Sequence, residues 1–418
     1  MSFLRFTVNL QLPMHGEFSK NQRLMLVAQA FRPAAPVDDL ELFAGRDKQR
    51  QEVIGAVSQT GYHVALYGER GVGKTSLARV LAAIFATGGP LQLQSAMVNC
   101  NTDDTFDSLW RAVFRRLGRE TDGEGALSPE DVRFEIEQLE GPALIVIDEL
   151  DRLENDDSLT LLADTIKTLS DNAIPSTLVL VGVANSIGEL IGEHESIVRN
   201  LAQIEMPRMK PEELEGILLK GCEHASIGIE ASAADRIVSL SEGLPHYTHL
   251  LGYRSAERTV QDDRSTVTLE DVEQALPRVV EGHTIQNEYV RAIRSSQPGN
   301  LYREVLLACA VAPKNSLGYF TSGQVRDPLE VIVGKRLDIP AFAKHMKEFL
   351  DPKRGSVLRR EGKPRGYSYR FSDPMIQPYV IMSSLADGLI TPQKLSELQS
   401  KAHETESDDE GRTRGRLF

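Results

Sequence analysis

The sequence predicts an α/β protein with a five-stranded parallel sheet, followed by an all-helical segment and a winged-helix domain. Three observations lead to this expectation. A glycine-rich loop at 68–75 lies between an apolar stretch of strand length and a stretch with helical spacing. Two further apolar runs, 143–147 and 178–183, end in polar side chains, as buried strands of parallel sheets do. Three helical stretches and a hairpin pattern follow between 301 and 371.

The composition is that of a globular protein with two or three domains. The 418 residues are 41% hydrophobic, which suffices for several cores. No apolar run approaches the length of a membrane span, and residues 1–6 are too short and mixed for a secretory signal. We therefore expect a cytoplasmic protein without a membrane partner. Cys100, Cys222 and Cys309 lack metal-ligand spacing, so reduced, buried thiols are expected.

Residues 68–75 carry the complete G-x-x-x-x-G-K-[ST] pattern of a phosphate-binding loop. Its glycines let backbone N–H groups turn toward phosphates, and the following helix adds the positive end of its dipole. We expect Lys74 to reach the β- and γ-phosphates of ATP and Thr75 to bind Mg²⁺. A glycine-rich turn with a surface lysine is the alternative, but it leaves the strand and helix at the flanks unexplained. The expected nucleotide contacts here are Gly68, Glu69, Arg70, Gly71, Val72, Gly73, Lys74, Thr75 and Ser76.

The ends of the next two apolar strands supply the groups that hydrolysis needs. Asp148 and Glu149 follow the strand at 143–147, and we assign Asp148 to Mg²⁺ and Glu149 to the attacking water. Asn185 follows the strand at 178–183 and is expected to contact the γ-phosphate or that water. The alternatives are two solvated acids and an asparagine that opens a turn. Together with the loop, these residues predict an ATPase.

This order of motifs resembles the AAA+ ATPases, and the resemblance covers most of the chain. Asn185 matches the family's sensor-1 position. Arg199 precedes the strand-like residues 203–206 and matches the arginine finger, which implies a homo-oligomer whose sites are completed by neighbouring subunits. Arg208 is the other candidate for the finger. A surface arginine on a solvated face is the alternative for Arg199.

Two further motifs are similar to the branch that holds the origin-recognition initiators and the STAND signalling ATPases. Residues 42–47 match the Gly-Arg motif at the start of that domain, although Gln49 replaces its second acid. The resemblance implies that Arg46 lies near the adenine. Gly243-Leu244-Pro245 is similar to the STAND lid, where the proline packs on the base. The sensor-2 arginine is absent there, and His246 stands in its neighbourhood.

His246 and His249 are spaced by one helical turn, but no third metal ligand is evident. We therefore expect a half-exposed pair on a helix.

The chain is expected to comprise five parts. These are an N-terminal arm at 1–36, the nucleotide-binding α/β domain at 37–209, a helical lid at 210–296, a winged-helix domain at 297–395 and an acidic disordered tail at 396–418. In the arm, residues 3–12 alternate like a strand and residues 32–36 form an extended linker. The expected strands lie near 63–67, 95–99, 143–147, 178–183 and 203–206, and the lid helices near 211–225, 231–242, 245–260 and 269–281.

The predicted winged helix is basic on an acidic chain. Residues 299–394 hold 15 Lys and Arg against 9 Asp and Glu, whereas the formal charge of the whole chain is −13. A basic wing can hold DNA phosphates. The alternative is a hairpin that contacts protein. The expected DNA contacts are Lys353, Arg354, Arg359, Arg360, Lys363 and Arg365.

Two functions remain open at this point, and a third, a metabolic kinase, is weaker because no second substrate site is visible. The first is an ATP-driven switch that assembles on nucleotide binding and acts on DNA, in replication initiation, transposition or mobile-element processes. The second is a STAND-like signalling or anti-phage defence ATPase whose winged helix contacts protein.

Overall fold

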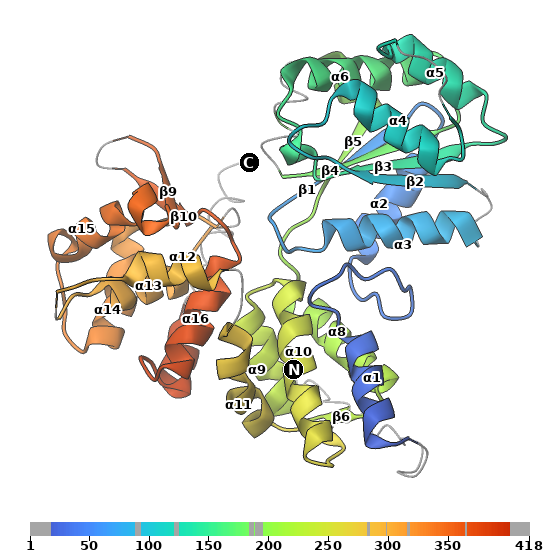
Figure 1. Ribbon diagram of the computed structural model, residues 1–418. Helices are drawn as coiled ribbons and strands as arrows, with labels where there is room; N and C mark the ends of the chain where they lie inside the picture. Colours follow the sequence, from blue (N-terminus) through green and yellow to red (C-terminus); the bar gives the residue numbers. More distant parts are fainter. Residues whose placement is uncertain are drawn as a thin grey trace, which may run out of the picture. The chain divides into compact units, whose positions relative to one another are not determined.

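Figure 1 shows the computed structural model, in which two compact units can be described. The first comprises residues 1–227 and 243–249, and the second comprises 228–242 and 250–418. The described residues are 18–87, 93–120, 125–183, 188, 195–281, 285–297, 299–315, 318–363 and 366–401. The expected strand at 3–12 lies outside them. The predicted domain boundaries at 209–210 and 296–297 stay predictions.

The predicted five-stranded parallel sheet is confirmed. Its strand order is β2-β3-β4-β1-β5, so β4 pairs with β1 on one side and with β3 on the other. Every residue of β3 and β4 is buried, as the continuous apolar runs require. The strands are β1 (His63–Tyr67), β2 (Gln94–Asn99), β3 (Ala143–Asp148), β4 (Thr177–Gly182) and β5 (Leu201–Glu205).

Helices cover both faces of this sheet (Figure 1). One face carries α2 (Asp47–Val57) and α3 (Lys74–Thr87). The other carries α4 (Phe106–Arg116), α5 (Pro129–Glu137) and α6 (Asp156–Asp171). The short 3-10 helix η1 (Leu150–Arg152) follows β3, and the 3-10 helix η2 (Glu195–Asn200) precedes β5. Two contacts fix α4 here: its Trp110 is fully buried in the core, and its first backbone N–H donates to the Ser158 hydroxyl of α6.

The arm contains a helix that the sequence analysis missed. Helix α1 (Lys20–Ala30) begins at a capping box between Ser19 and Gln22 and packs against α8 (Pro211–His224). Phe31, which ends α1, is 1% exposed and lies so close to Gly221 that a Cβ there would be 2.5 Å from its ring. Because α1 shows little hydrophobic periodicity, its partner in α8 rather than its own pattern explains its position.

The second unit contains the predicted helices and hairpin. Helices α13, α14 and α15 precede the antiparallel strands β9 and β10, which is the order expected of a winged helix; that assignment stays a prediction. The elements are β6 (Gly228–Ile229), α9 (Ala231–Ser241), the part of α10 (Pro245–Gln261) from residue 250, β7 (Thr266–Val267), α11 (Leu269–Val280), α12 (Gln286–Ile293), α13 (Tyr302–Val311), β8 (Phe320–Thr321), α14 (Ser322–Val333), α15 (Ile339–Glu348), η3 (Pro352–Arg354), β9 (Leu358–Glu361), β10 (Ser368–Phe371) and α16 (Ile376–Ala386).

The predicted start of the disordered tail, residue 396, is too early, because a helix continues past it. Residues 392–401 are helical, and Leu398 is 5% exposed. Gln399 donates to Glu242 Oε1 over 2.8 Å, so a specific contact holds this segment. The remaining tail, 402–418, lies outside the described residues. Within the described part of the chain, no helix is long and apolar enough to cross a membrane.

His63, the first residue of β1, makes the fold sensitive to acid. Its Nδ1 accepts a hydrogen bond from Leu178 N over 3.0 Å, and burial lowers its pKa from 6.5 to about 4. Below pH 6.5 the unfolded chain binds a proton that the folded chain does not. The free energy of unfolding should therefore fall by about 3 kcal/mol as the pH drops from 6.5 to about 4.

His63→Asn tests this origin of the acid sensitivity. The amide oxygen replaces Nδ1 as the acceptor but does not titrate, so the variant should lose less stability on acidification than the unaltered protein. Urea unfolding at about pH 7.5 and about pH 4 measures both losses. Equal losses in the two proteins would contradict this account of His63.

Candidate nucleotide site

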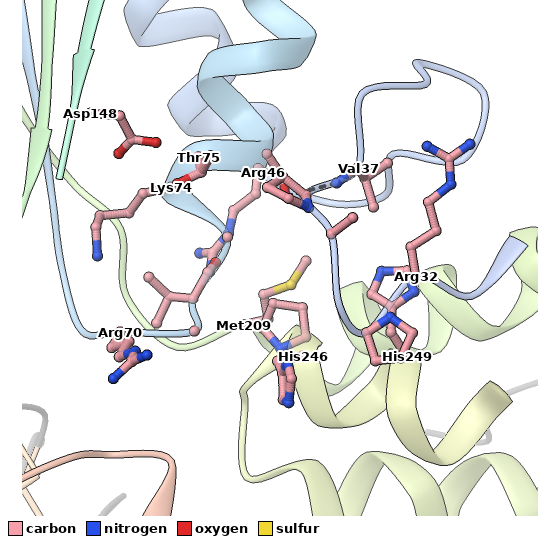
Figure 2. Close-up of a pocket in the computed structure, with 18 of the residues that line it drawn as sticks. Arg32, Val37, Arg46, Arg70, Lys74, Thr75, Asp148, Met209, His246 and His249 are labelled. Atoms are coloured by element: carbon pink, nitrogen blue, oxygen red, sulfur yellow. Dashed lines mark hydrogen bonds between the residues drawn. The ribbon is translucent and has the colours of Figure 1, made fainter. Parts of the chain in front are cut away.

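The first unit contains a cavity of about 620 Å³ at the carboxyl edge of the sheet. Figure 2 shows Lys74, Thr75 and Asp148 at one end, and Met209, His246 and His249 at the other. This volume lies in the ordinary range for sites of small-molecule ligands. Of the expected nucleotide contacts, Arg46, Arg70, Gly71, Val72, Gly73, Lys74, Thr75, Ser76 and Pro245 line it, together with Asp148 and Glu149.

The loop at 68–75 needs its glycines for two different reasons. Gly71 and Gly73 have φ angles of 84° and 93°, in the left-handed region that side chains disfavour. Gly68 lies against the end of β5, where a Cβ would be 2.3 Å from the Met206 carbonyl oxygen. The loop therefore follows β1 closely and starts α3 at Lys74.

Lys74 is bonded within its own loop. Its Nζ donates to the carbonyl oxygens of Gly68 and Glu69 over 3.0 and 2.9 Å. Burial lowers the pKa of Lys74, and the nearby carboxylates of Asp151 and Asp148 oppose that shift. The ammonium group is thus held beside the loop backbone, close to the carboxylates of Asp148 and Asp151.

Thr75, which follows β1 at the start of α3, and Asp148, at the end of β3, lie at the same end of the cavity, although β4 lies between β1 and β3 (Figure 2). Asp148 is 2% exposed, and its Oδ1 accepts a hydrogen bond from Glu149 N over 2.8 Å. Burial raises the pKa of Asp148, and the neighbouring Thr75 hydroxyl opposes the shift. Asp148 Oδ2 has no hydrogen-bond partner among the described residues. A buried carboxylate oxygen without a partner, beside a hydroxyl, fits a hard divalent cation such as Mg²⁺.

Glu149 turns the chain away from the sheet. Its φ of 56° is left-handed, and η1 begins directly after it. Its carboxylate is partly exposed and lies 3.2 Å from Arg152 Nη1. Arg152 and Asp151 also line the cavity, and the sequence analysis missed both. The sequence offered one indication of their role, because both follow directly after the acid pair Asp148 and Glu149.

Arg46 contacts the backbone of the loop. It is 3% exposed, and its Nη2 donates to the carbonyl oxygens of Val72 and Pro207 over 2.8 and 2.7 Å. The backbone N–H of Arg46 donates to Glu213 Oε1 over 2.7 Å. The contact to adenine stays a prediction, because the bonds formed here hold the phosphate loop to the chain that follows β5.

The end of the cavity remote from Lys74 is largely apolar. Val37 N donates to Ser76 Oγ over 3.1 Å, which joins the segment after α1 to the start of α3. His249 is 7% exposed, so the expected half-exposed histidine pair is wrong at this position. Burial, with smaller effects of His246 and Arg32, lowers the pKa of His249 to about 4. No cluster of three metal-ligating side chains occurs in the part of the chain that the structure describes.

The two candidate arginine fingers have different surroundings. The side chain of Arg199 is 74% exposed, lies 3.7 Å from Asp171 and is not among the described residues that line the cavity. Arg208 Nε lies 2.7 Å from Glu69 Oε2 in the phosphate loop. Asn185 lies outside the described residues.

Comparison with known proteins agrees with this geometry. Residues 57–191 match the family described as AAA domain. The ORC1-type DNA replication protein 8 of Halobacterium salinarum is 28% identical over 284 residues, which are 59% of this chain and 71% of that protein. This chain is therefore similar to AAA+ proteins of the ORC type.

One solved structure of another protein supports the fold of this chain. The ORC2 protein of Aeropyrum pernix, in complexes with ADPNP and ADP, matches with a TM-score of 0.50 at 14% identity, over 88% of this chain and 100% of that one. The ORC1 protein of the same organism, in complex with DNA, has a TM-score of 0.49 at 16% identity, over 90% and 100%.

The described residues among the predicted DNA contacts fall into two groups. Lys353, Arg359, Arg360 and Lys363 are exposed, whereas Arg365 lies outside the described residues. Arg354 is held inside its own unit: its Nε lies 3.0 Å from Glu348 Oε2, and its Nη1 donates to the carbonyls of residues 292 and 294. Among the described predicted contacts, it is the exposed group that presents charge on the surface.

Asp148→Asn tests the cation site. The amide keeps the shape and the oxygen that accepts from Glu149 N, but it removes the charge. We expect nucleotide affinity in Mg²⁺ to fall roughly 10- to 100-fold, with a much smaller change in EDTA. Fluorescence titration with a labelled nucleotide measures both. The exposed Asp156→Asn is the matched control, and an equal loss with and without Mg²⁺ would contradict the assignment.

Proposed function

We propose that this chain binds ATP with Mg²⁺ in the cavity and hydrolyses it. The observation that carries the proposal is that Thr75 lines the same end of the cavity as the buried Asp148, whose Oδ2 has no hydrogen-bond partner among the described residues. The phosphate loop and Lys74 stand at the same end of the cavity. This combination of a hydroxyl, an acid, a lysine and a glycine-rich loop at the start of a helix is the chemistry that a nucleoside triphosphate requires.

Lys74 is the group that exchanges partners when phosphate arrives. Its two present acceptors are neutral carbonyls, and anionic phosphate oxygens form stronger, charge-assisted hydrogen bonds. Lys74 then stabilises the charge that develops on the β- and γ-phosphates. Mg²⁺ held by Thr75 and Asp148 would neutralise part of the same charge.

Glu149 is the group that we assign to the attacking water. It lines the cavity directly after Asp148, and its partly exposed carboxylate can accept a proton from water there. Arg152 Nη1, 3.2 Å from this carboxylate, orients it. Asn185 is proposed to orient the same water or the γ-phosphate.

We assign Arg199 to the site of a neighbouring subunit in a homo-oligomer. Its exposure of 74% and its position away from the described lining of its own cavity support this role. Nucleotide-dependent assembly is the consequence, since an exposed guanidinium gains a strong partner only when the adjacent subunit holds a triphosphate.

The proposed target of the switch is DNA, in the initiation of replication. A relative named ORC1-type DNA replication protein supports this, as does the exposed basic group at Lys353, Arg359, Arg360 and Lys363. Arg360 also stacks on Tyr367 at 4.0 Å from the ring centroid, which fixes its guanidinium on the hairpin. These residues would contact phosphates, so binding should depend strongly on salt.

A STAND-like signalling or defence role is the second candidate. Pro245 lines the cavity, and a Cβ at Gly73 would lie 3.7 Å from its ring, which favours a proline that packs on the bound base. In this case the hairpin contacts protein, and DNA binding should be absent even at low salt.

Lys74→Ala and Glu149→Gln separate binding from hydrolysis. Lys74→Ala should abolish detectable ATP binding in calorimetry, because the phosphates lose their main cation. Glu149→Gln should retain ATP affinity but hydrolyse ATP at least roughly 100-fold more slowly, because the attacking water loses its base. Unaltered affinity in the first variant, or unaltered turnover in the second, would overturn these roles.

The triple variant Arg359→Ala, Arg360→Ala, Lys363→Ala tests the DNA interface. If each residue neutralises one phosphate, the slope of log affinity against log salt should decrease by about 3. Fluorescence anisotropy with duplex DNA and ATP measures the slope. A matched triple variant of the exposed Arg115, Arg116 and Lys167 controls for net charge. Equal effects of the two triples, or no binding by the unaltered protein at low salt, would reject the interface.

A further inference from the structure

The phosphate loop contacts the segment that follows β5, which we call the 206–210 linker. Met206 N donates to the Tyr67 carbonyl oxygen over 2.7 Å, and Gly68 has no room for a Cβ beside Met206 O. Arg46 bridges the two segments a second time through Val72 O and Pro207 O. A shift of the loop is therefore transmitted to the linker by direct contact.

The linker in turn contacts the helices that follow it. Met209 N donates to Gly243 O over 2.8 Å, two residues before α10 begins at Pro245. Lys210 N donates to Glu213 Oε2 in the first turn of α8 over 2.9 Å. The linker thus joins the loop to the first turns of both α8 and α10.

Arg208 is the one charged linker residue that is paired with the phosphate loop. Its Nε lies 2.7 Å from Glu69 Oε2, and the two side chains are 26% and 36% exposed. Glu69 also accepts, at its backbone carbonyl, a hydrogen bond from Lys74 Nζ. Arg208 and Lys74 are therefore bonded to the same loop residue, one through its carboxylate and one through its backbone.

We propose that Arg208 distinguishes ATP from ADP within its own subunit by exchanging Glu69 for the terminal phosphate. The inference rests on the proposed nucleotide binding. A third phosphate adds negative charge at the mouth of the loop, where it repels the Glu69 carboxylate and competes with it for the guanidinium. A diphosphate does not supply this charge, and the ion pair between Arg208 and Glu69 persists.

Arg208 is not among the described residues that line the cavity, and two observations favour it for this task. No arginine or lysine occurs between Gly243 and His249, so the first turn of α10 offers no permanent cation. Arg70 lies on the loop itself and moves with it, whereas Arg208 lies on the linker. When Arg208 leaves Glu69, the contacts of Met209 with Gly243 and of Lys210 with Glu213 carry the change to α10 and α8.

The test is the ratio of affinities for a non-hydrolysable ATP analogue and for ADP, measured by calorimetry with Mg²⁺. Arg208→Ala should weaken binding of the ATP analogue about tenfold and change ADP affinity far less, so that the ratio falls. Arg208→Lys should recover part of the loss, because an ammonium keeps the charge without the planar fork. Glu69→Gln should raise the ratio, since the competing carboxylate is gone. Arg116→Ala, exposed on α4, is the matched control.

The outcomes separate this inference from the proposed function. Equal losses for both nucleotides in Arg208→Ala, or an unchanged ratio in both Arg208→Ala and Glu69→Gln, would overturn the inference and leave ATP binding intact. If a mixture of Arg208→Ala with Lys74→Ala regains ATPase activity, Arg208 acts on a neighbouring subunit and the proposal is also overturned. If the unaltered protein binds neither nucleotide, the proposed function fails and this inference fails with it.

Discussion

The backbone hydrogen bonds that place β4 between β1 and β3 determine the geometry of the candidate site. All pairs in the sheet are parallel, so β1, β3 and β4 end at one edge. The loop after β1 must reach across the end of β4 to bring Thr75 to Asp148. The space over the end of β4 is the phosphate end of the cavity, and Gly182 and Val183 line it. Removing the hydroxyl, the carboxylate or the strand between them would therefore remove the same site.

Buried charge keeps the site rigid. Arg46 is almost fully buried, and burial lowers its pKa while Glu213 opposes that shift. A guanidinium in this position is tolerated because it satisfies two backbone carbonyls that would otherwise lack donors. Arg208 is only partly buried and is paired with the Glu69 carboxylate. The first arginine thus fits a permanent connection, and the second fits one that can change with the ligand.

The basic residues of the second unit also fall into two kinds, those that are packed against other side chains and those that are exposed. Arg354 lies over the Tyr302 ring at 3.6 Å and is paired with Glu348, which makes it part of the packing. Arg359 and Lys363 remain exposed. A count of basic residues cannot distinguish these two fates, because the count depends on composition and the fates depend on which acids and aromatics the fold brings near.

The sequence alone determined the sheet and the phosphate end of the site, because these depend on local patterns. Apolar runs of strand length gave the strands, and the fixed spacing in 68–75 and 143–149 gave Lys74, Thr75, Asp148 and Glu149. Tertiary structure decided the rest. Helix α1, the apolar end of the cavity and the burial of His249 depend on packing between segments some 200 residues apart, and no local pattern records that packing. Only the fold could bring Arg46 to Val72 or Arg208 to Glu69, since a side chain's partner is fixed by distance in space and not in sequence.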